Sequence, residues 1–298
     1  MDQAVLMEMK RGKKEHSNID PSIKQKGYNE KTRVIAVTSG KGGVGKTNIA
    51  ANFAYILSVM GKRILLLDAD TGLANIDLIL GISPKYNLCH VLQGEKTLSE
   101  VIVQGPGGMK ILPAASGIEH MAELSKGQKF ALLDELNDLH EGLDFVFIDT
   151  GAGIAGNVMY FNMVAKEIIV VVSPEPTSFT SAHALIKVLY QGYAIKRFMI
   201  LVNMVRDSDE AKGVFRKLMY ATEQFINISI EYLGYIPWDK NVQESVRQQH
   251  LLAEIFPHSR ASKCLLSIAR KLCQEQPEYY ENGTIKLFGK AIVDKDDR

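Results

Sequence analysis

The chain has 298 residues, of which 46% are hydrophobic and 23% charged, and its 35 basic and 34 acidic side chains leave a formal net charge of +1. This is the composition of an ordinary globular protein, and the near-neutral charge gives no global reason to expect nucleic acid or an anionic surface as the main partner. The chain has three cysteines without a CxxC pair, no secretory signal, and no apolar run of the roughly 18 to 20 residues that span a bilayer, which favours a cytoplasmic protein.

Seven short apolar runs alternate with segments of helix length. The first is "RVIAVTSG" at 33–40, and the others lie at 63–68, 109–114, 145–149, 167–173, 197–203 and 231–237. Continuous apolar strands separated by helices are typical of a parallel sheet that helices cover on both faces. The sequence therefore predicts an α/β fold with a doubly wound, mostly parallel sheet.

Two segments lie outside this alternation. Residues 1–32 are polar and contain "KRGKK", so we expect a mobile arm, and the chain after the predicted last core helix at 259–273 is Tyr-rich and then charged. The sequence thus predicts an arm (1–32), one domain (33–273) and a tail (274–298).

The stretch "SGKGGVGKTN" at 39–48 contains a complete phosphate-binding loop. It follows a predicted strand and opens a predicted helix, which is the context that this motif requires. The glycines let backbone N–H groups surround the phosphates, Lys46 is expected to reach the β- and γ-phosphates, and Thr47 is expected to bind Mg²⁺. The predicted nucleotide-binding residues of the loop are Gly40, Gly42, Gly43, Val44, Gly45, Lys46, Thr47 and Asn48.

Aspartates end two of the predicted strands. Asp149 closes the strand "FVFID" and Asp68 closes "RILLLD", so both are candidate Mg²⁺ ligands beside Thr47. Asp70 lies two residues further on and is placed to orient an attacking water, as a catalytic residue; the alternatives are a helix cap or a solvated loop acid. The glycine-rich "DTGAG" at 149–153 can respond to the γ-phosphate.

In the loop, Lys41 directly follows the first glycine, Gly40. With this lysine, "KGGVGKT" at 41–47 resembles the deviant Walker A signature of the MinD/ParA family of ATPases, and "DADTGLANID" resembles their switch I. The similarity runs from about Arg33 to Cys273. The resemblance implies a slow, Mg²⁺-dependent ATPase whose ATP-bound form dimerises and whose hydrolysis resets it. It also implies that Lys41 is catalytic across the dimer, where it contacts the ATP of the opposite subunit.

Within that family, Asn48 in place of a second threonine, "NLCHVLQGEKTLSEVI" and "SPEPTSFTSAHALIK" are similar to the flagellar-number regulators of the FlhG (FleN, YlxH) branch. This implies control of flagellar number and placement, with flagellar C-ring components or a flagellar transcription regulator as partners. The resemblance further implies that Asn203 hydrogen-bonds adenine and that Pro237 and Asp239 border the base. Trp238 between them is expected to pack against the protein body.

The N-terminus "MDQAVLMEMK" resembles the "DQAxxLR" motif with which such regulators stimulate an FlhF-like GTPase. Asp2, Gln3 and Ala4 match and are the predicted partner-binding residues, whereas Met7 and Glu8 replace the leucine and the arginine. The charge reversal at Glu8 removes an arginine-finger role for that position.

Near the other end, "TIKLFGKAIVD" at 284–294 looks like the membrane-targeting helix of MinD-type proteins. Ile285, Phe288 and Ile292 lie at helical spacing and are the predicted membrane contacts, so the resemblance implies peripheral, reversible association with the cytoplasmic membrane in the ATP-bound dimer. An edge strand or a disordered tail is the alternative.

Other functions are compatible with parts of the pattern. A MinD-type division-site ATPase is disfavoured by Asn48 and the "DQA" arm, and a ParA-type DNA-segregation ATPase needs a basic face. A nitrogenase-type iron protein would need two cluster-binding cysteines per subunit, but Cys264 and Cys273 fall in the predicted last helix. A non-hydrolysing scaffold is the remaining alternative.

Overall fold

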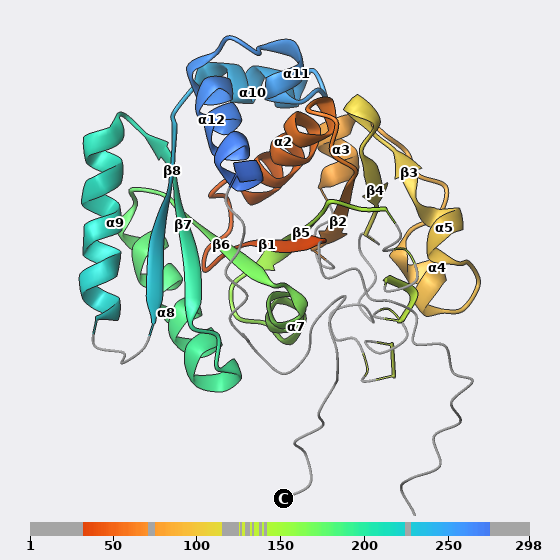
Figure 1. Ribbon diagram of the computed structural model, residues 1–298, viewed down its shortest axis with the longest axis horizontal. Coiled ribbons are helices and arrows are strands. Elements are labelled where there is room, and N and C mark those ends of the chain that lie inside the picture. Colours follow the sequence, from red (N-terminus) through yellow and green to blue (C-terminus); the bar gives the residue numbers. More distant parts are fainter. Residues whose placement is uncertain are drawn as a thin grey trace, which may run out of the picture.

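The computed structural model describes residues 32–70, 75–114, 142–223 and 228–274, together with several residues between 125 and 139. Their strands form one sheet of eight strands in the order β3-β4-β2-β5-β1-β6-β7-β8 (Figure 1). Neighbouring strands are parallel except β3 and β4, which pair antiparallel at one edge. The predicted α/β fold with a mostly parallel, doubly wound sheet is confirmed.

Seven of the eight strands coincide with the predicted apolar runs. Their bounds are β1 (Arg33–Ser39), β2 (Ile64–Ala69), β4 (Lys110–Leu112), β5 (Phe145–Ala152), β6 (Glu167–Val172), β7 (Arg197–Val205) and β8 (Ser229–Pro237). The sequence did not indicate β3 (Val103–Gln104) because two residues are too few to show a period.

Helices cover both faces of the sheet (Figure 1). One face carries α2 (Lys46–Val59), α3 (Ile76–Leu80), α10 (Lys240–Arg247), α11 (Leu252–Ile255) and α12 (Arg260–Gln274). The other carries α4 (Leu88–Leu92), α5 (Leu98–Val101), α7 (Gly156–Val164), α8 (Pro176–Tyr193) and α9 (Ser208–Thr222). The short 3-10 helix η1 (Pro106–Gly108) lies against α2.

The two faces give the protein two hydrophobic cores. In β1, Val34 and Ala36 belong to the core beneath α7 and α8, whereas Ile35 and Val37 belong to the core beneath α2 and α12. All four are fully buried, and burying a Val or Ile side chain stabilises a fold by about 1.5 to 3 kcal/mol. Burial on both sides is the reason why these strands read as continuous apolar runs.

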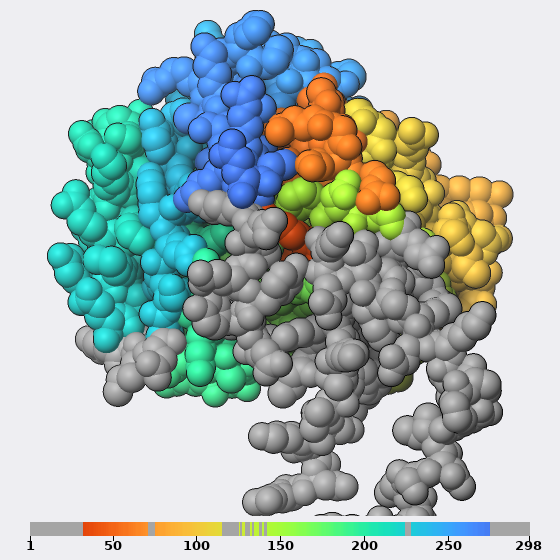
Figure 2. Space-filling model, in the orientation of Figure 1, coloured from red at the N-terminus to blue at the C-terminus, as the bar shows by residue number. Residues whose placement is uncertain are grey.

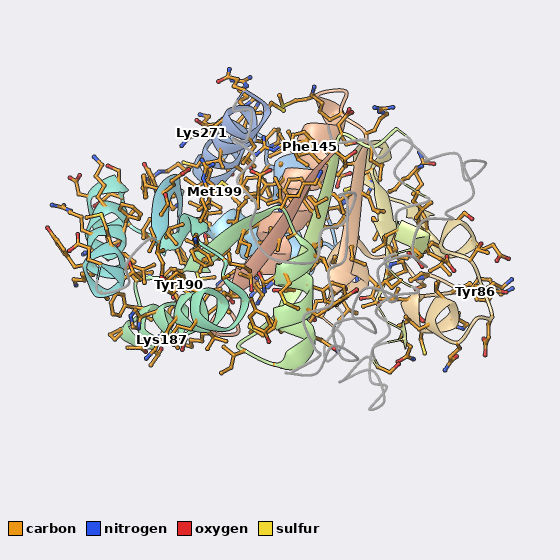
Figure 3. All side chains as sticks on the ribbon, turned by 60° about the horizontal axis from the view of Figure 1, so that its bottom comes forward. Tyr86, Phe145, Lys187, Tyr190, Met199 and Lys271 are labelled. Atoms are coloured by element: carbon orange, nitrogen blue, oxygen red, sulfur yellow. The ribbon has the colours of Figure 1, made fainter. Side chains whose placement is uncertain are left out.

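The last helix, α12, lies along α2 on the molecular surface (Figure 2). The apolar stripe predicted for it is buried, and Lys271 lies on the side of the sheet opposite to Lys187 and Tyr190 of α8 (Figure 3). The guanidinium of Arg33 binds Glu167 of β6, with 2.8 Å between Nε and Oε1, and also donates to the carbonyl of Leu272. This contact ties the end of α12 to the sheet.

The order of the central strands decides where a ligand can bind. Because β2, β5 and β1 are parallel neighbours, their carboxyl ends meet at one edge of the sheet. β2 and β5 lie on one side of β1 in the sheet, and β6 lies on the other side. The strand order therefore reverses at β1, and ligands bind at such a point in open α/β sheets. The loop that follows β1 lies at this point.

Among the described helices, none combines the length and the apolarity that crossing a bilayer requires.

Candidate nucleotide site

The loop between β1 and α2 is fitted closely to two neighbouring elements. A Cβ atom on Gly40 would lie 2.0 Å from the backbone oxygen of Ser181 in α8, and one on Gly45 would lie 2.5 Å from Nδ2 of Asn203. Gly45 also has a φ of 92°, in the left-handed region that favours glycine. Asn203, near the end of β7, donates from Nδ2 to the carbonyl of Val44 over 2.8 Å. The path of the loop therefore requires glycine at both positions.

The tip of the loop is exposed. Gly42 and Gly43 are exposed, and a Cβ atom on either would meet no other atom within 4 Å. Helix α2 begins directly behind the loop at Lys46 and presents its N-terminal N–H groups and positive dipole end to it, and Asn48 is half-buried in its first turn. A backbone of this kind is an anion site, because unpaired N–H groups and the helix dipole both favour negative charge.

The side chain of Lys46 lies in the interior of the site. Only 8% of the residue is exposed, and burial lowers the pKa of its ammonium, while Asp149 and Asp70 act in the opposite direction. The side chain of Thr47 is close enough to the carboxyl of Asp149 to lower its pKa. Lys46 and Thr47 thus face the same acidic cluster, as the loop motif predicts.

Two buried carboxyl groups lie side by side beneath the loop. Asp68 of β2 and Asp149 of β5 occupy paired positions on neighbouring strands, and each is 1% exposed. Burial raises the pKa of Asp149 to about 7, an effect that the side chain of Thr47 and the charge of Lys46 partly offset. Burial and the charge of Asp149 also hold the pKa of Asp68 well above its usual range.

These residues fit a magnesium ion. The Oδ1 atom of Asp149 is buried and has no hydrogen-bond partner among the described residues, and a buried, unpaired carboxylate oxygen is costly unless a cation or donor meets it. Mg²⁺ prefers carboxylate and hydroxyl oxygens together with phosphate and water, and Thr47, Asp68 and Asp149 supply such oxygens next to the phosphate loop. Bound there, Mg²⁺ would neutralise charge on the β- and γ-phosphates.

Asp70 lies close to this cluster, beside the carboxyl end of β5. Its backbone N–H donates to Oδ1 of Asp68 over 3.1 Å, and its own Oδ1 lies 3.4 Å from the position of a Cβ atom on Gly151. Gly151 keeps the two chain segments close, and Asp70 is near enough to Lys46 to affect its pKa. The geometry brings the predicted catalytic carboxylate to the predicted phosphate site.

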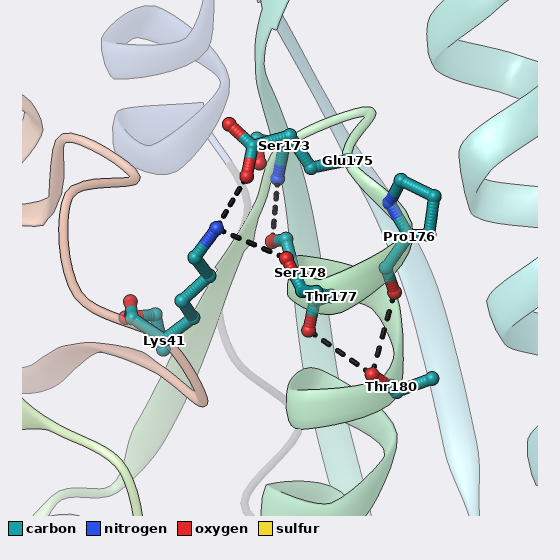
Figure 4. Close-up of polar contacts among 8 residues, drawn as sticks. Lys41, Ser173, Glu175, Pro176, Thr177, Ser178 and Thr180 are labelled. Atoms are coloured by element: carbon teal, nitrogen blue, oxygen red, sulfur yellow. Dashed lines mark hydrogen bonds and ion pairs between the residues drawn. The ribbon is translucent and has the colours of Figure 1, made fainter.

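The second lysine of the loop points elsewhere. The Nζ atom of Lys41 contacts the carboxylate of Glu175 and lies 3.0 Å from the hydroxyl of Thr177, both at the start of α8 (Figure 4). The side chain is 38% exposed, in contrast to the buried Lys46. Within one chain, therefore, the two lysines of the loop face different surroundings. The contact with Glu175 could not be predicted from local sequence, because the two residues are 134 positions apart.

Two of the residues predicted to contact the base, Asn203 and Asp239, already make hydrogen bonds within the protein. Asn203 holds Val44, as described above, and Asp239 accepts from Asn241 N–H over 3.0 Å and from Ala261 N–H over 3.2 Å, so it caps α10 and braces the start of α12. Pro237 ends β8 next to them. The amide of Asn203 keeps its acceptor oxygen and its second N–H for contact with a base.

The expectation that Trp238 packs against the body is wrong. Trp238 is 59% exposed, and its backbone N–H donates to the carbonyl of Val205 at the end of β7. Met204 next to it is 38% exposed, has a φ of 61°, and brings its Cε within 3.7 Å of the position of a Cβ atom on Gly45. Met204 thus gives the loop an apolar neighbour that the sequence did not reveal, because no pattern distinguishes it from core residues.

Some predicted residues cannot be placed. Asp2, Gln3 and Ala4 of the arm and Ile285, Phe288 and Ile292 of the tail lie outside the described residues. The three cysteines are free, and Cys89 belongs to the core on one face of the sheet whereas Cys273 packs against the core on the other. Cys89 and Cys273 of one chain therefore do not meet as ligands of a cluster.

The chain is similar in sequence to known nucleotide-binding and flagellar proteins. The AAA domain family matches residues 32–197, which is more than half of the chain. The antiactivator FleN of Pseudomonas aeruginosa is 43% identical over 271 residues, which cover 91% of this chain and 97% of FleN. The flagellum site-determining protein YlxH of Helicobacter pylori is 33% identical over 257 residues, 86% of this chain and 85% of YlxH.

The fold is also similar to that of a solved structure. The septum site-determining protein MinD of Pyrococcus horikoshii, complexed with Mg-ADP, superimposes with a TM-score of 0.66 at 26% identity and covers 81% of this chain and 96% of its own. Fold, loop and relatives agree, and the chain belongs to the MinD/ParA-type ATPases, in the branch that contains FleN and YlxH.

Proposed function

We propose that this protein is an ATP-dependent dimerising switch that hydrolyses ATP slowly and regulates the number and placement of flagella. The flagellar role follows from its similarity to FleN and YlxH, and the ATPase role from its family. The observation that supports the switch most directly is that the two lysines of the loop lie in different surroundings. Lys46 lies among the buried carboxyl groups, whereas Lys41 contacts α8 at the surface.

ATP and Mg²⁺ are the ligands of this site. The loop 40–47 and the start of α2 bind the phosphates, Lys46 balances their charge, and Thr47, Asp68 and Asp149 hold the metal directly or through water. Asn203, Pro237 and Asp239 border the base. Asp70 orients the attacking water, which is the task of a carboxylate or amide in phosphoryl transfer.

Lys41 completes the site of a second copy of the chain. Its ammonium is 38% exposed and is therefore accessible to the phosphates of a partner subunit. The γ-phosphate then has a contact that only the dimer provides, and a ligand shifts an equilibrium by its difference in affinity for the two states. ATP favours the dimer for this reason, and hydrolysis returns the protein to the monomer.

The ends of the chain provide the outputs of the switch. We assign partner contact to the arm (1–32), with Asp2, Gln3 and Ala4 directed to an FlhF-like GTPase. The ATPase domain is 33–273, and the tail (274–298) binds the cytoplasmic membrane through Ile285, Phe288 and Ile292. Two copies of a weak anchor in the dimer hold a membrane far better than one. Flagellar C-ring components or a flagellar transcription regulator are the further partners.

One observation favours a second function, DNA segregation of the ParA type. Helix α12 carries Arg260, Lys263, Arg270 and Lys271 and has no acidic residue. A basic helix of this kind can bind phosphate backbones without sequence preference, with an affinity that falls steeply as salt rises. Binding to duplex DNA that is lost between low and moderate salt, and that needs ATP, would support this second function.

The test of the switch is the mass of the protein in solution with different nucleotides. Light scattering after size-exclusion chromatography with Mg²⁺ is expected to give a monomer with ADP and a dimer with a non-hydrolysable ATP analogue. The same samples are then mixed with liposomes and with the FlhF-like GTPase in a pull-down. A monomer under all conditions, while the analogue binds, would reject the dimerising switch.

A further inference from the structure

The sheet is irregular where it meets the nucleotide site. Val37 of β1 lies opposite Asp149 of β5, but two residues later Ser39 lies opposite Ala152. Between these pairs β5 therefore has one residue more than β1, which is a bulge. Thr150 and Gly151 lie in this bulge, directly after the predicted metal ligand Asp149.

A buried polar cluster fills the bulge. The hydroxyl of Thr150 lies 2.9 Å from that of Thr38 in β1 and 3.3 Å from the carbonyl of Val37. The third polar residue is Asn162 of helix α7, whose Nδ2 donates to the Thr38 hydroxyl over 3.2 Å. All three residues are at most 1% exposed. We call Thr38, Thr150 and Asn162 the bulge cluster.

Asn162 is an unusual residue for its position. It is fully buried on a helix whose neighbouring side chains, such as Met159 and Phe161, are apolar. Its Nδ2 also donates to the carbonyl of Val158 over 2.7 Å, while its Oδ1 has no hydrogen-bond partner among the described residues. A buried amide is costly and a poor helix former, and leucine would fill similar space, so packing alone does not explain an asparagine here.

The bulge cluster joins three segments that surround the phosphate site. Ser39, next to Thr38, accepts from Gly153 N–H over 2.9 Å through its carbonyl and donates from its hydroxyl to the carbonyl of Lys41 over 2.7 Å. Thr150 precedes the glycine-containing segment 151–155, and α7 begins where that segment ends. A displacement of segment 151–155 by the γ-phosphate must therefore act on the bulge cluster and α7 together.

We propose that Asn162 is a positioning residue that couples α7 to the phosphate site through Thr38 and Thr150. The proposal rests on the proposed nucleotide switch. It adds how a change at the phosphate site is transmitted to α7, a helix outside the site. Asn162 touches neither nucleotide nor metal in this scheme. It sets the position of α7 against the bulge, so that α7 follows the state of segment 151–155.

The experiment compares hydrogen exchange of the full chain with Mg²⁺ plus ADP and with Mg²⁺ plus a non-hydrolysable ATP analogue. Peptides from α7 and from loop 40–47 are followed in the unsubstituted protein, in Asn162→Leu and in Thr150→Val. In the unsubstituted protein α7 is expected to exchange at different rates in the two states. In Asn162→Leu that difference is expected to shrink by about 2- to 12-fold, the range for one net hydrogen bond, at unchanged ADP affinity.

Thr222→Val is the matched control. Thr222 is also a buried threonine, but among the described residues the partners of its hydroxyl are carbonyls of its own helix, α9, those of Leu218 and Met219. It is expected to lower stability without changing the state dependence of α7. If Asn162→Leu fails to fold, Thr150→Val alone must reduce the α7 difference for the proposal to stand.

Other outcomes would overturn the proposal. If Asn162→Leu is less stable but keeps the full α7 difference, then Asn162 is only a structural brace and the coupling is wrong. The coupling is equally wrong if α7 of the unsubstituted protein exchanges alike in both states while loop 40–47 is protected by both nucleotides. If neither nucleotide protects loop 40–47 of the unsubstituted protein, the proposed nucleotide switch fails as well.

Discussion

Lys41 pairs with Glu175 at the start of α8, and the same ammonium lies 3.0 Å from the hydroxyl of Thr177. Both members of the ion pair are exposed by more than a third, and pairs of this kind contribute about 0 to 1 kcal/mol. A phosphate can replace Glu175 as the partner of Lys41 at little cost. The ion pair with Glu175 thus holds Lys41 away from the nucleotide site of its own subunit, but it is weak enough to be replaced by another partner.

Replacing Lys41 by alanine separates its role from that of Lys46. We expect Lys41→Ala to bind ADP with nearly normal affinity, because the buried Lys46 serves the phosphates of its own subunit, but to lose ATP-dependent dimerisation and most ATP hydrolysis. Calorimetry with ADP and light scattering with ATP measure the two effects. The control Lys46→Ala is expected to lose nucleotide binding. A large loss of ADP affinity in Lys41→Ala would instead place Lys41 in the site of its own subunit.

The carboxylate of Asp70 lies beside Gly151 and Lys46, where a water attacking the γ-phosphate would need a base or an acceptor. We expect Asp70→Ala to bind ATP and Mg²⁺ but to hydrolyse ATP at least tenfold more slowly, as is usual for the loss of a general base. The variant should accumulate as a dimer with ATP. Single-turnover hydrolysis and light scattering test this, and a variant that turns over ATP at the normal rate would remove Asp70 from catalysis.

Asp149 gives the nucleotide-free protein a pH dependence. An unfolded aspartate has a pKa of about 3.9, whereas burial raises the pKa of Asp149 to about 7, so between these values the folded state holds a proton that the unfolded state has lost. The contribution of this group to the free energy of unfolding therefore falls as pH rises from about 4 to 7 and is constant above. Asp68, whose pKa is also raised, acts with the same sign.

We accordingly expect Asp149→Asn to have a higher melting temperature than the parent without metal or nucleotide, with a gain that grows between about pH 4 and 7. With Mg²⁺ and ADP the order should reverse, because the parent gains ligand binding that the variant lacks. Melting curves of both proteins test this, with the exposed Asp209→Asn as the control. An equal gain at about pH 4 and about pH 8 would contradict the assignment.

The parts of the fold that depend on local pattern could be predicted from the sequence. The apolar runs indicate seven strands because burial on two faces makes most strand positions apolar. The loop 40–47 is recognisable because its chemistry requires particular residue types at fixed spacing. The partners of loop residues could not be predicted. Glu175 meets Lys41, and Asn203 meets Val44, only through strand order and helix packing, which no local pattern encodes.

The closeness of Gly40 to α8 allows a test with an internal control. A Cβ atom on Gly40 would overlap the backbone of Ser181 and Ala182, at 2.0 and 2.7 Å, whereas one on Gly42 would meet nothing within 4 Å. Backbone atoms cannot turn aside as side chains do, so loop and helix must separate. We expect Gly40→Ala to lose about 1 to 3 kcal/mol of stability, the usual cost of overpacking, and to bind ADP more weakly.

Gly42→Ala is expected to keep the melting temperature of the parent, because the added methyl group is exposed and its backbone does not need the left-handed region. Chemical denaturation of the two variants and the parent, without nucleotide, measures the difference. Equal stability of Gly40→Ala and Gly42→Ala would mean that α8 does not press on the loop. The start of α8, which carries Glu175 and Thr177, would then be too far from the loop to hold Lys41 as described.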